Sequence, residues 1–592
     1  MDDPRKQGPQ QGPIDWSEFI KQAQQSGAGA DFNKIKSRFS HLKKRTIIIA
    51  AVVLVLVLAF AYWWFHPAIN IQSIDLWGFL IVILALVTFV LFVFRQIYQT
   101  GMGKREKSPK KVKLFSGLMA IPIAIAVIGA VGWLASQSFF PGNAEKYSTV
   151  LVTEDADFAT DIPEVNYSEI PFIDKDSAIL LGNRTMGTMA DYVSQFEISD
   201  LYSQINYKGQ PVRVSPLNYA DFFKWWANKD GGIPAYVIVN MSTQDTEIVR
   251  LENPIRYSDS DPFFYNVDRH VQLSYPFYMF DEKSFEINDD GEPFWIYPVQ
   301  KRTIGLFGGT TIQRVVLCNA STGECQDFAI EDVPQWVDRA YPAELLIEQY
   351  NWSGALSGGW INSWLGQNGV KQTTPSTDGK SGFNYIAQDD DVWVYSGVTS
   401  ATADNSIIGC VMINQRTAES KFYSVAGATE ESAMRSAEGQ VQHLQYDATF
   451  PLLINVDGQP TYFMALKDAA CLVKMYAMVD IQRYQNVAVG DTLAATEKSY
   501  KQLLVSQGIN VGGSDASAHP SAGSTSGTIA SISPVVLDGN SHYYLILDGQ
   551  QAIFDCPVAS VVDVVRYKVG DVIVLNHGSS EGNVVLVDSI GE

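Results

Sequence analysis

The chain has 592 residues and a formal net charge of −21, and this length exceeds what one hydrophobic core organises, so two or more folded units are expected. Residues 1–114 contain 16 Lys and Arg against 7 Asp and Glu, which leaves 27 against 57 for the remainder, a net charge of −30. So acidic a surface argues against binding to nucleic-acid phosphates or anionic lipids, whereas it is compatible with divalent cations without defining a site.

Three apolar stretches follow a mostly polar N-terminal tail, at residues 46–65, 76–94 and 115–136. Each has about the ~20 residues that cross a bilayer, and none contains Asp, Glu, Lys or Arg. The sequence therefore predicts three N-terminal transmembrane helices. The first is expected to act as a signal anchor, because 45 residues precede it.

Lysine and arginine predict how these helices are oriented. They are concentrated in the tail, residues 1–45, and in the loop at residues 95–114, whereas the short loop at 66–75 has none. Because positively charged loops stay in the cytoplasm, we expect a cytoplasmic N-terminus and an extracellular portion beginning near residue 137. The predicted location is the cytoplasmic membrane.

The third apolar stretch carries small residues at helix-packing intervals. They are Gly117, Ala120, Ala124, Gly129 and Gly132. Small residues allow close helix–helix approach, within the chain or against another protein. We interpret the helices as an anchor that has an additional role in assembly.

Residues 147–505 are predicted to form an extracellular α+β domain built from repeated hairpins. An Asn-x-x-Thr-x-Asp/Glu motif follows an apolar strand three times, at Asn240-Thr243-Asp245, Asn319-Thr322-Glu324 and Asn414-Thr417-Glu419. Asn and Thr hydrogen-bond to nearby backbone and so favour turns, while the flanking β-branched runs favour strands. A repeated hairpin is more typical of a binding scaffold than of an active site.

A second repeated motif supports this interpretation. Asn288-x-Asp290-Gly291-x-Pro293 matches Asn455-x-Asp457-Gly458-x-Pro460, and looser copies begin at Asn206 and Asn228. Asp-Gly is typical of tight hairpin turns because Gly adopts a positive φ without steric cost. Amphipathic helices are expected among these strands, at residues 219–227, 333–350, 430–442 and 491–504.

The end of the chain has a different composition. Residues 506–526 are rich in Gly, Ser and Ala, which is typical of a flexible linker. Five short apolar runs occupy residues 527–592. They predict a small, OB-like β-barrel.

Two of the hairpins carry a family resemblance. The segments VVLCNASTGECQDF and VMINQRTAESKFY resemble the final hairpin of PepSY-type propeptide modules, in which Asp-x-x-Thr-Gly-Glu/Lys separates two apolar strands. The second hairpin keeps Thr322-Gly323-Glu324, the others lack the Gly, and all three have Asn in place of the Asp. The chain as a whole is similar to uncharacterised membrane-anchored envelope proteins of Gram-positive bacteria. The resemblance implies a module that binds or restrains a partner protein, without catalytic residues.

The sequence contains few candidate reactive or metal-binding groups. Cys318 and Cys325 flank the turn of the second hairpin, so either a disulfide across it or two half-buried thiols is expected. No cysteine spacing matches a zinc motif, and His270 is interpreted as a surface residue on a strand. Acidic clusters such as Asp259/Asp261 lack the spacing of a calcium loop, so whether a divalent cation binds stays open. No cofactor is predicted.

One aromatic segment stands apart from the periodic elements. In WSGALSGGWINSWLGQNG, Trp352, Trp360 and Trp364 alternate with Gly and Ser, without a clear helix or strand period. Such a loop either folds over the core or presents a surface to a partner. We take these three residues as candidate partner contacts.

These patterns together predict a non-enzymatic, membrane-anchored envelope protein. Its acidic extracellular domain would bind or scaffold a partner protein or an envelope component. Two alternatives remain open at this stage: an extracellular hydrolase of peptide or cell-wall glycan, and an accessory subunit of a multi-protein membrane complex.

Overall fold

The computed structural model describes residues 44–100, 108–164, 170–375, 382–388, 390–400, 406–507, 509, 523–537, 540–550, 552–558, 561–577 and 584–591. The chain divides into two compact units, Met1–Thr496 and Glu497–Glu592. The predicted linker at 506–526 falls largely outside the described residues, and strand structure resumes at Gly523.

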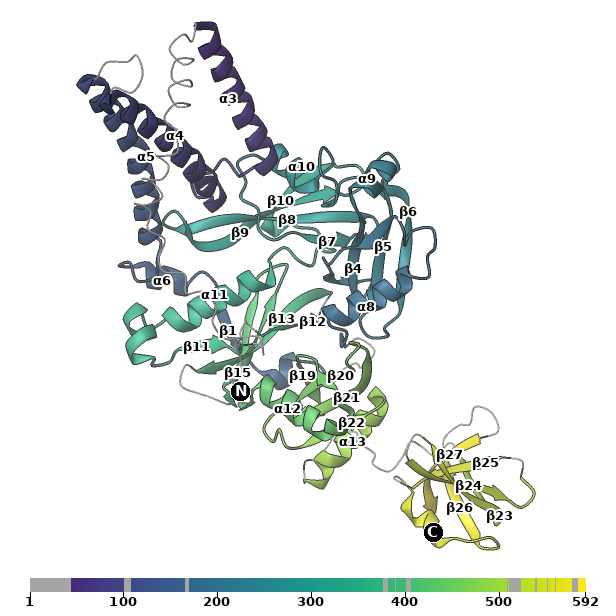
Figure 1. Cartoon of the computed structure of the whole chain (residues 1–592). Helices are drawn as coiled ribbons and strands as arrows, with labels where there is room; N and C mark the ends of the chain where they lie inside the picture. The colour runs from purple at the N-terminus through teal and green to yellow at the C-terminus, as the bar shows by residue number, and fades with distance from the viewer. Residues whose placement is uncertain are drawn as a thin grey trace, which may run out of the picture. The chain divides into compact units, whose positions relative to one another are not determined.

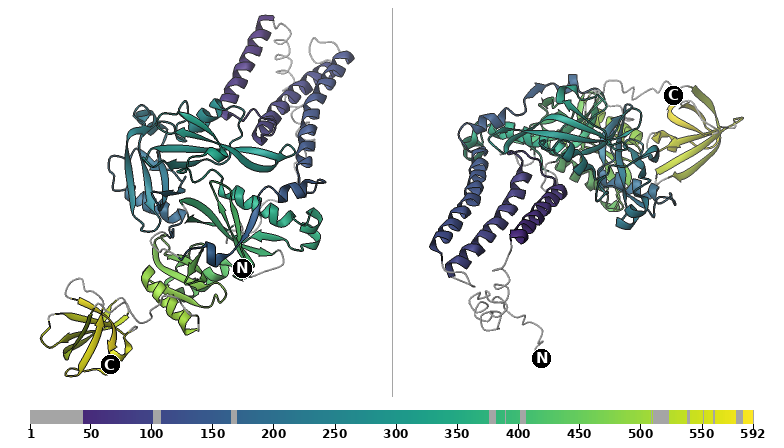
Figure 2. Two further views of the ribbon diagram at one scale, coloured as in Figure 1. Left: turned by 180° about the vertical axis from the view of Figure 1, so that it is seen from behind. Right: turned by 90° about the horizontal axis from the view of Figure 1, so that it is seen from above.

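Three helices project from the same side of the first unit (Figures 1 and 2): α3 (Lys44–Phe65), α4 (Ile74–Thr100) and α5 (Pro109–Ala135). Among the described residues, α4 and α5 are long and apolar enough to cross a membrane, and almost none of their side chains is buried. In α3 the apolar helix found is the shorter run Val52–Phe65. Two helices of spanning length are thus found among the described residues, and the prediction of three is corrected to two.

The rest of the first unit repeats one arrangement four times, namely a helix followed by a four-strand antiparallel meander. The first copy has α8 (Lys175–Met186), β3 (Ser203–Tyr207), β4 (Gln210–Tyr219), β5 (Ile233–Asn240) and β6 (Thr246–Ile255). The second has α10 (Val267–Ser274), β7 (Ser284–Ile287), β8 (Pro293–Ile304), β9 (Gly308–Asn319) and β10 (Cys325–Ala329). The third has α11 (Ala343–Leu356), β12 (Asn384–Gln388), β13 (Asp391–Ser400), β15 (Gly409–Asn414) and β16 (Ser420–Tyr423). The fourth has α12 (Glu430–Gln440), β19 (Leu452–Val456), β20 (Gln459–Lys467), β21 (Val473–Asp480) and β22 (Val487–Gly490).

Shorter elements extend these sheets or connect the copies. The additional strands are β1 (Thr153–Ala156), β2 (Phe196–Ile198), β11 (Lys371–Thr373), β14 (Ser406–Ile407), β17 (Gly427–Ala428) and β18 (Asp447–Ala448). The additional helical segments are α6 (Asn143–Ser148), α7 (Phe158–Asp161), α9 (Phe222–Asn228), a π-helical turn η2 (Asn362–Gly366) and α13 (Leu493–Ser506). Among these strands, β1 pairs in parallel with β16, so the segment after α6 completes the sheet of the third copy. The domain is thus strand-rich with several sheets, and the expectation of one α+β domain is corrected accordingly.

The three Asn-x-x-Thr motifs form the turns between the third and fourth strands of copies one to three. In each turn the Asn side-chain oxygen accepts hydrogen bonds from two backbone N–H groups, at 2.8–3.0 Å. The acidic residue donates its backbone N–H to the Thr hydroxyl, at 3.2–3.3 Å. Asp480 accepts from the N–H groups of Gln482 and Arg483 at the same place in copy four. The motif is therefore a side-chain-stabilised turn, and a short carboxylate performs the same bonding as the amide.

The copies share cores with their neighbours. One cluster of buried residues joins the third and fourth copies and includes Tyr395, Met412, Tyr462 and Met464. Another joins the second and third and includes Ile296, Leu317, Leu346 and Val411. Because each sheet buries its apolar face against an adjacent copy, the copies form one continuous structure.

The second unit is a closed five-stranded barrel in the order β23 (Gly523–Leu537), β24 (Asn540–Leu547), β25 (Ile553–Pro557), β27 (Val584–Gly591) and β26 (Val572–His577). All neighbouring strands are antiparallel except β25 and β27. Its core includes Leu545, Phe554, Cys556 and Leu575. That this barrel is OB-like stays a prediction.

Candidate functional site

Helix α10 organises the candidate site. It begins after Asn266, whose side-chain oxygen accepts the backbone N–H of Arg269 at 3.1 Å. One side of α10 borders a cavity of about 310 Å³. The residues that line this cavity are His66, Leu201, Asp259, Asp268, Gln272, Phe280, Asp281, Glu282, Lys283 and Tyr297. Asp268 and Gln272 reach it together because residues four apart lie on one face of a helix.

The cavity contains four carboxylates against one ammonium group. Lys283 Nζ lies 2.9 Å from Asp259 Oδ1 and 2.7 Å from Asp268 Oδ1, and the Tyr297 hydroxyl donates to Asp268 at 2.7 Å. Burial raises the pKa of Asp259, and the nearby Lys283 offsets only part of this effect. Burial acts to lower the pKa of Lys283, but the two carboxylates outweigh it and the pKa is raised. Lys283 therefore stays protonated, and Asp281 and Glu282 add negative charge that it does not neutralise.

His66, the residue after α3, lines the cavity. Figure 1 shows this end of α3 beside α10. Arg269 donates from Nε to the Trp63 carbonyl at 3.1 Å, and its guanidinium lies 4.2 Å from the centre of the Trp63 ring. The Trp63 ring also packs against Phe264, with the ring centroids 5.9 Å apart. The backbone N–H of Ile69 donates to the Pro276 carbonyl at 2.7 Å. These contacts hold the end of α3 and the segment after it against the region around α10.

Large apolar side chains are exposed around this region. The exposed fraction is 80% for Phe223 and Phe264 and 64% for Trp226 and Phe277. Buried Asp261 holds the underlying loop, because it accepts the Trp225 indole N–H at 2.6 Å and the backbone N–H of Phe263 at 2.8 Å. Aromatic residues exposed beside membrane-type helices are typical of a membrane–water interface.

The three candidate tryptophans have different surroundings. Trp352 is half-buried and packs against Tyr147, with ring centroids 4.9 Å apart, so it belongs to a core cluster. Trp360 stacks on Trp364 and contacts Phe139, which follows α5. The exposed fraction of Trp364 is 68%, and those of its neighbours Ile361 and Leu365 are similar. The structure thus leaves Trp364, with part of Trp360, available for a partner.

The cysteine pair lies on the opposite side of α10. Cys318 in β9 and Cys325 in β10 are direct partners in register, and both are free thiols in this structure. Their side chains and that of His270 on α10 offer ligand atoms that lie within 4.8 Å of one another. The interpretation of His270 as a strand residue is wrong, since α10 carries it to the hairpin. The disulfide between Cys318 and Cys325 stays a prediction.

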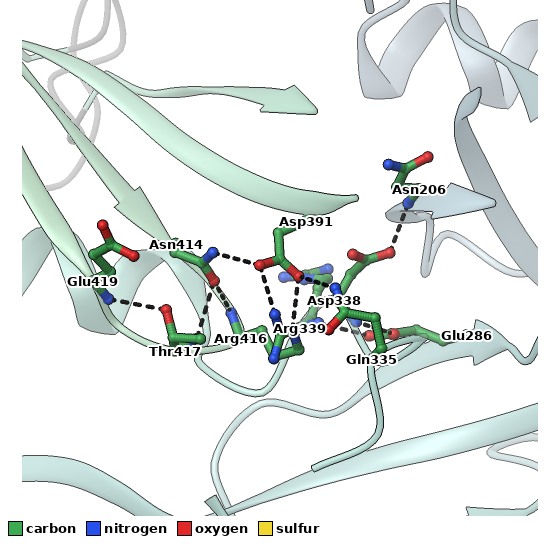
Figure 3. A network of polar contacts seen from close by, with 10 residues as sticks. All are labelled: Asn206, Glu286, Gln335, Asp338, Arg339, Asp391, Asn414, Arg416, Thr417 and Glu419. Atoms are coloured by element: carbon green, nitrogen blue, oxygen red, sulfur yellow. Dashed lines mark hydrogen bonds and ion pairs between the residues drawn. The ribbon is translucent and has the colours of Figure 1, made fainter. Parts of the chain in front are cut away.

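A separate buried polar network connects three of the copies (Figure 3). Asn414 donates to Asp391 at 2.7 Å, and Arg416 forms two bonds to the same carboxylate, at 2.7 and 2.8 Å. Asp338 donates its backbone N–H to Glu286 at 2.9 Å and accepts the Asn206 N–H at 2.6 Å. These contacts join β3 of the first copy and the segment before α11 to β7 of the second copy. Gln335 in the same segment donates to Asp391 of the third copy at 3.3 Å.

Two carboxylates in this network are fully buried. Burial raises the pKa of Glu286, and burial together with the Glu286 carboxylate raises the pKa of Asp338 well above its usual range. Their exposed fractions are 0% and 1%, so no substrate reaches them. This carboxylate pair lies inside the junction of the copies.

The small residues of α5 fall into two groups. A Cβ atom on Gly129 would meet the Trp77 ring of α4, and one on Gly132 would meet Leu306 in the β8–β9 hairpin. Among the described residues no atom lies within 4 Å of the corresponding position at Gly117. Ala120 and Ala124 on the same helix are exposed. The first group packs within the chain and the second is free for another helix.

Comparisons with known proteins identify no relative. No protein-family model matches the chain, and no curated protein does. Among solved structures, a mutant of Synechocystis apocarotenoid oxygenase aligns at 11% identity over 52% of this chain and 67% of that chain, with a TM-score of 0.17. A GH32 beta-fructofuranosidase of Bombyx mori aligns at 10% identity over 69% of each chain, with a TM-score of 0.16. A levansucrase mutant of B. megaterium aligns at 10% identity over 73% and 98%, with a TM-score of 0.15.

All three of these proteins are enzymes by name, and the prediction that this chain is not an enzyme is not maintained. At these TM-scores the alignments assign no fold, activity or residue role to this chain. The site is therefore interpreted from its own geometry.

Proposed function

We propose that this chain is a membrane-anchored envelope protein whose folded part, outside the membrane, binds a partner protein or an envelope component. The observation that carries the proposal is the cavity beside α10, in which four carboxylates face one lysine. A cationic group fits this cavity best, because four carboxylates line it and Lys283, its one lining ammonium group, pairs with Asp259 and Asp268 only. The expected occupant is a lysine-rich or arginine-rich segment, or an amine of the envelope.

The charge distribution supports the outside location of the folded part. With α4 and α5 as the spans, the segment between them carries Lys104, Arg105 and Lys107, and further lysines begin α5. Positively charged loops remain in the cytoplasm, so the chain after α5 is expected on the outer side. The exposed aromatic side chains around α9 would then lie at the outer membrane surface.

An impermeant lysine-reactive reagent applied to intact cells tests this topology without any substitution. Lys146 and Lys229 are expected to be labelled, and Lys104 and Lys107 are expected to be labelled only after lysis. Labelling of Lys104 in intact cells would contradict the proposal.

Binding at the cavity is tested with the full-length protein in detergent and an oligolysine peptide as the probe. The double variant Asp281→Asn/Glu282→Gln removes two charges without disturbing the bonds of Lys283. Each charge at an effective dielectric near a protein surface contributes on the order of 1 kcal/mol, so removal of two charges should lower the affinity roughly 30-fold. The matched control is Asp289→Asn/Asp290→Asn, which makes the same charge change on an exposed turn. Equal affinities for both double variants would refute a role for the cavity.

A second candidate function, as an accessory subunit of a multi-protein membrane complex, rests on α5. Gly117, Ala120 and Ala124 are exposed on one face of this helix. Such a face allows another transmembrane helix to approach closely. Gly117→Leu should abolish crosslinks from α5 to a partner in native membranes, whereas Ala130→Leu on the same helix should preserve them.

A further inference from the structure

A histidine and two cysteines converge on the side of α10 that faces the β9–β10 hairpin. Cys318 is fully buried, and Cys325 and His270 are half-buried. One ligand atom from each lies within 4.8 Å of the other two. A zinc ion with Zn–S bonds of about 2.3 Å and Zn–N bonds of about 2.0–2.1 Å holds its ligand atoms roughly 3.5–4 Å apart. The arrangement is therefore close to that of a bound metal.

The hairpin brings the two sulfur atoms together. The backbone N–H of Asn319 donates to the Glu324 carbonyl at 2.9 Å, which makes these two residues a hydrogen-bonded pair. Since such pairs alternate along an antiparallel ladder, the next pair, Cys318 and Cys325, is not hydrogen-bonded. Side chains in such pairs stand closest together, so both thiols point to the same side of the sheet.

One ring nitrogen of His270 is bonded to a backbone carbonyl. His270 Nε2 lies 2.8 Å from the Gly323 carbonyl oxygen, which can only accept, so Nε2 carries the proton. The neutral imidazole then has its free lone pair on Nδ1. Ligating histidines commonly donate their second N–H to a backbone carbonyl, which fixes the ring and the tautomer. The Tyr257 ring, 4.3 Å from the imidazole between centroids, holds it from the other side.

We propose that Cys318, Cys325 and His270 bind one zinc ion, through the two sulfur atoms and the imidazole nitrogen. Two thiolates and an imidazole form a ligand set that favours Zn²⁺ over Mg²⁺ or Ca²⁺, which prefer oxygen ligands. Zinc binds the thiolate form of cysteine, so any proton that the two thiols still carry is released when the ion binds. The fourth coordination position is left to water or to an exogenous ligand.

The same sulfur atoms could instead form a disulfide, and the two outcomes exclude each other. A disulfide brings the sulfur atoms to about 2.05 Å and leaves neither available as a thiolate. His270 has no role in a disulfide, whereas it is one of three ligands in the zinc site. Substitution of His270 therefore separates the two.

The test uses full-length protein in detergent, stripped of metal with a chelator, reduced and titrated with Zn²⁺ alone. Wild type is expected to bind one equivalent, and His270→Asn and Cys325→Ser are expected to bind at least 10-fold more weakly. Cys471→Ser is the matched control, because Cys471 is also a half-buried free thiol and lies outside the cluster. Replacement of Zn²⁺ by Co²⁺ should give a thiolate-to-metal absorption band in wild type and in the control.

A second measurement uses the wild-type protein alone, so it tests the proposal even if the variants do not fold. Zn²⁺ should protect Cys318 and Cys325, and not Cys471, from alkylation mapped by mass spectrometry. The proposal is overturned if reduced protein with free thiols takes up no zinc, or if His270→Asn binds as tightly as wild type. A native Cys318–Cys325 disulfide whose reduced form binds no zinc would also overturn it.

Discussion

The Tyr257 ring occupies the space into which a Cβ atom of Gly323 would project. Gly323 is at φ +76°, and the residues at the same position in the other two Asn-x-x-Thr turns, Gln244 and Ala418, are at φ +68° and +59°. All three turns thus need a residue in the left-handed backbone conformation, but only the second turn also needs that residue to have no side chain. The reason is that Tyr257 packs between this turn and His270.

Gly323→Ala should therefore destabilise the protein. We expect a loss of about 2–4 kcal/mol in the free energy of unfolding, from roughly 1 kcal/mol of backbone strain and a clash with Tyr257 that must be relieved by movement. Chemical denaturation in detergent, followed by tryptophan fluorescence, measures it. Ala418→Gly is the control and should change stability by less than about 1 kcal/mol. Similar losses for the two variants would show that Tyr257 does not restrict this position.

The asparagines of the repeated turns should differ in their contribution to stability. Asn414→Ala removes the two turn bonds and also the bond to Asp391, and it leaves that buried carboxylate short of a donor. We expect a loss of about 3 kcal/mol, against about 1 kcal/mol for Asn240→Ala, whose side chain bonds only within its turn. The same denaturation measurement compares them. Equal losses would mean that the network in Figure 3 adds nothing to the turn.

Asp338 should make stability depend on pH. Its pKa is raised well above the usual range by burial and by Glu286, so the folded state binds the proton more tightly than the unfolded chain does. The associated stability is complete below the unfolded pKa of about 3.9 and is lost as pH rises toward the folded pKa.

Asp338→Asn should remove this dependence, because the amide imitates the protonated carboxyl and still accepts the Asn206 N–H. Between pH 4 and the folded pKa, stability of the variant relative to wild type should rise by up to about 1.4 kcal/mol per pH unit. Thermal unfolding midpoints from pH 4 to pH 8 provide the measurement. Parallel curves for wild type and the variant would rule out the raised pKa, and Asp290→Asn on the exposed turn should give a curve parallel to wild type.

Cys325 should react as a thiolate near neutral pH in the reduced, metal-free protein. The Cys318 thiol and His270 together lower the pKa of Cys325 despite its burial, and the pKa of Cys318 is raised. Alkylation of Cys325 should therefore reach half its maximal rate well below pH 8.5, the ordinary value for a thiol. His270→Asn should move this midpoint upward, and a midpoint unchanged by that substitution would show that the imidazole does not stabilise the thiolate.

The sequence by itself determined the features that depend on neighbours within a few residues. The turns at Asn240, Asn319 and Asn414 were predictable because their hydrogen bonds close within five residues, as were the apolar helices α4 and α5. The fourth copy of the turn was missed because Asp480 replaces the Asn, although the bonding is the same. Three apolar stretches predicted three spanning helices, whereas two helices among the described residues are long and apolar enough to cross.

Only the tertiary structure decided which groups meet. His270 lies 48 residues before Cys318, and the cavity collects side chains from residue 66 to residue 297. No local pattern encodes such contacts, because they depend on how the sheets pack and on which face of α10 each residue occupies. The same packing half-buried Trp352 and left Trp364 exposed, although both come from one Gly-rich segment. Backbone hydrogen bonding near a residue can be inferred from its sequence, whereas burial depends on the whole chain.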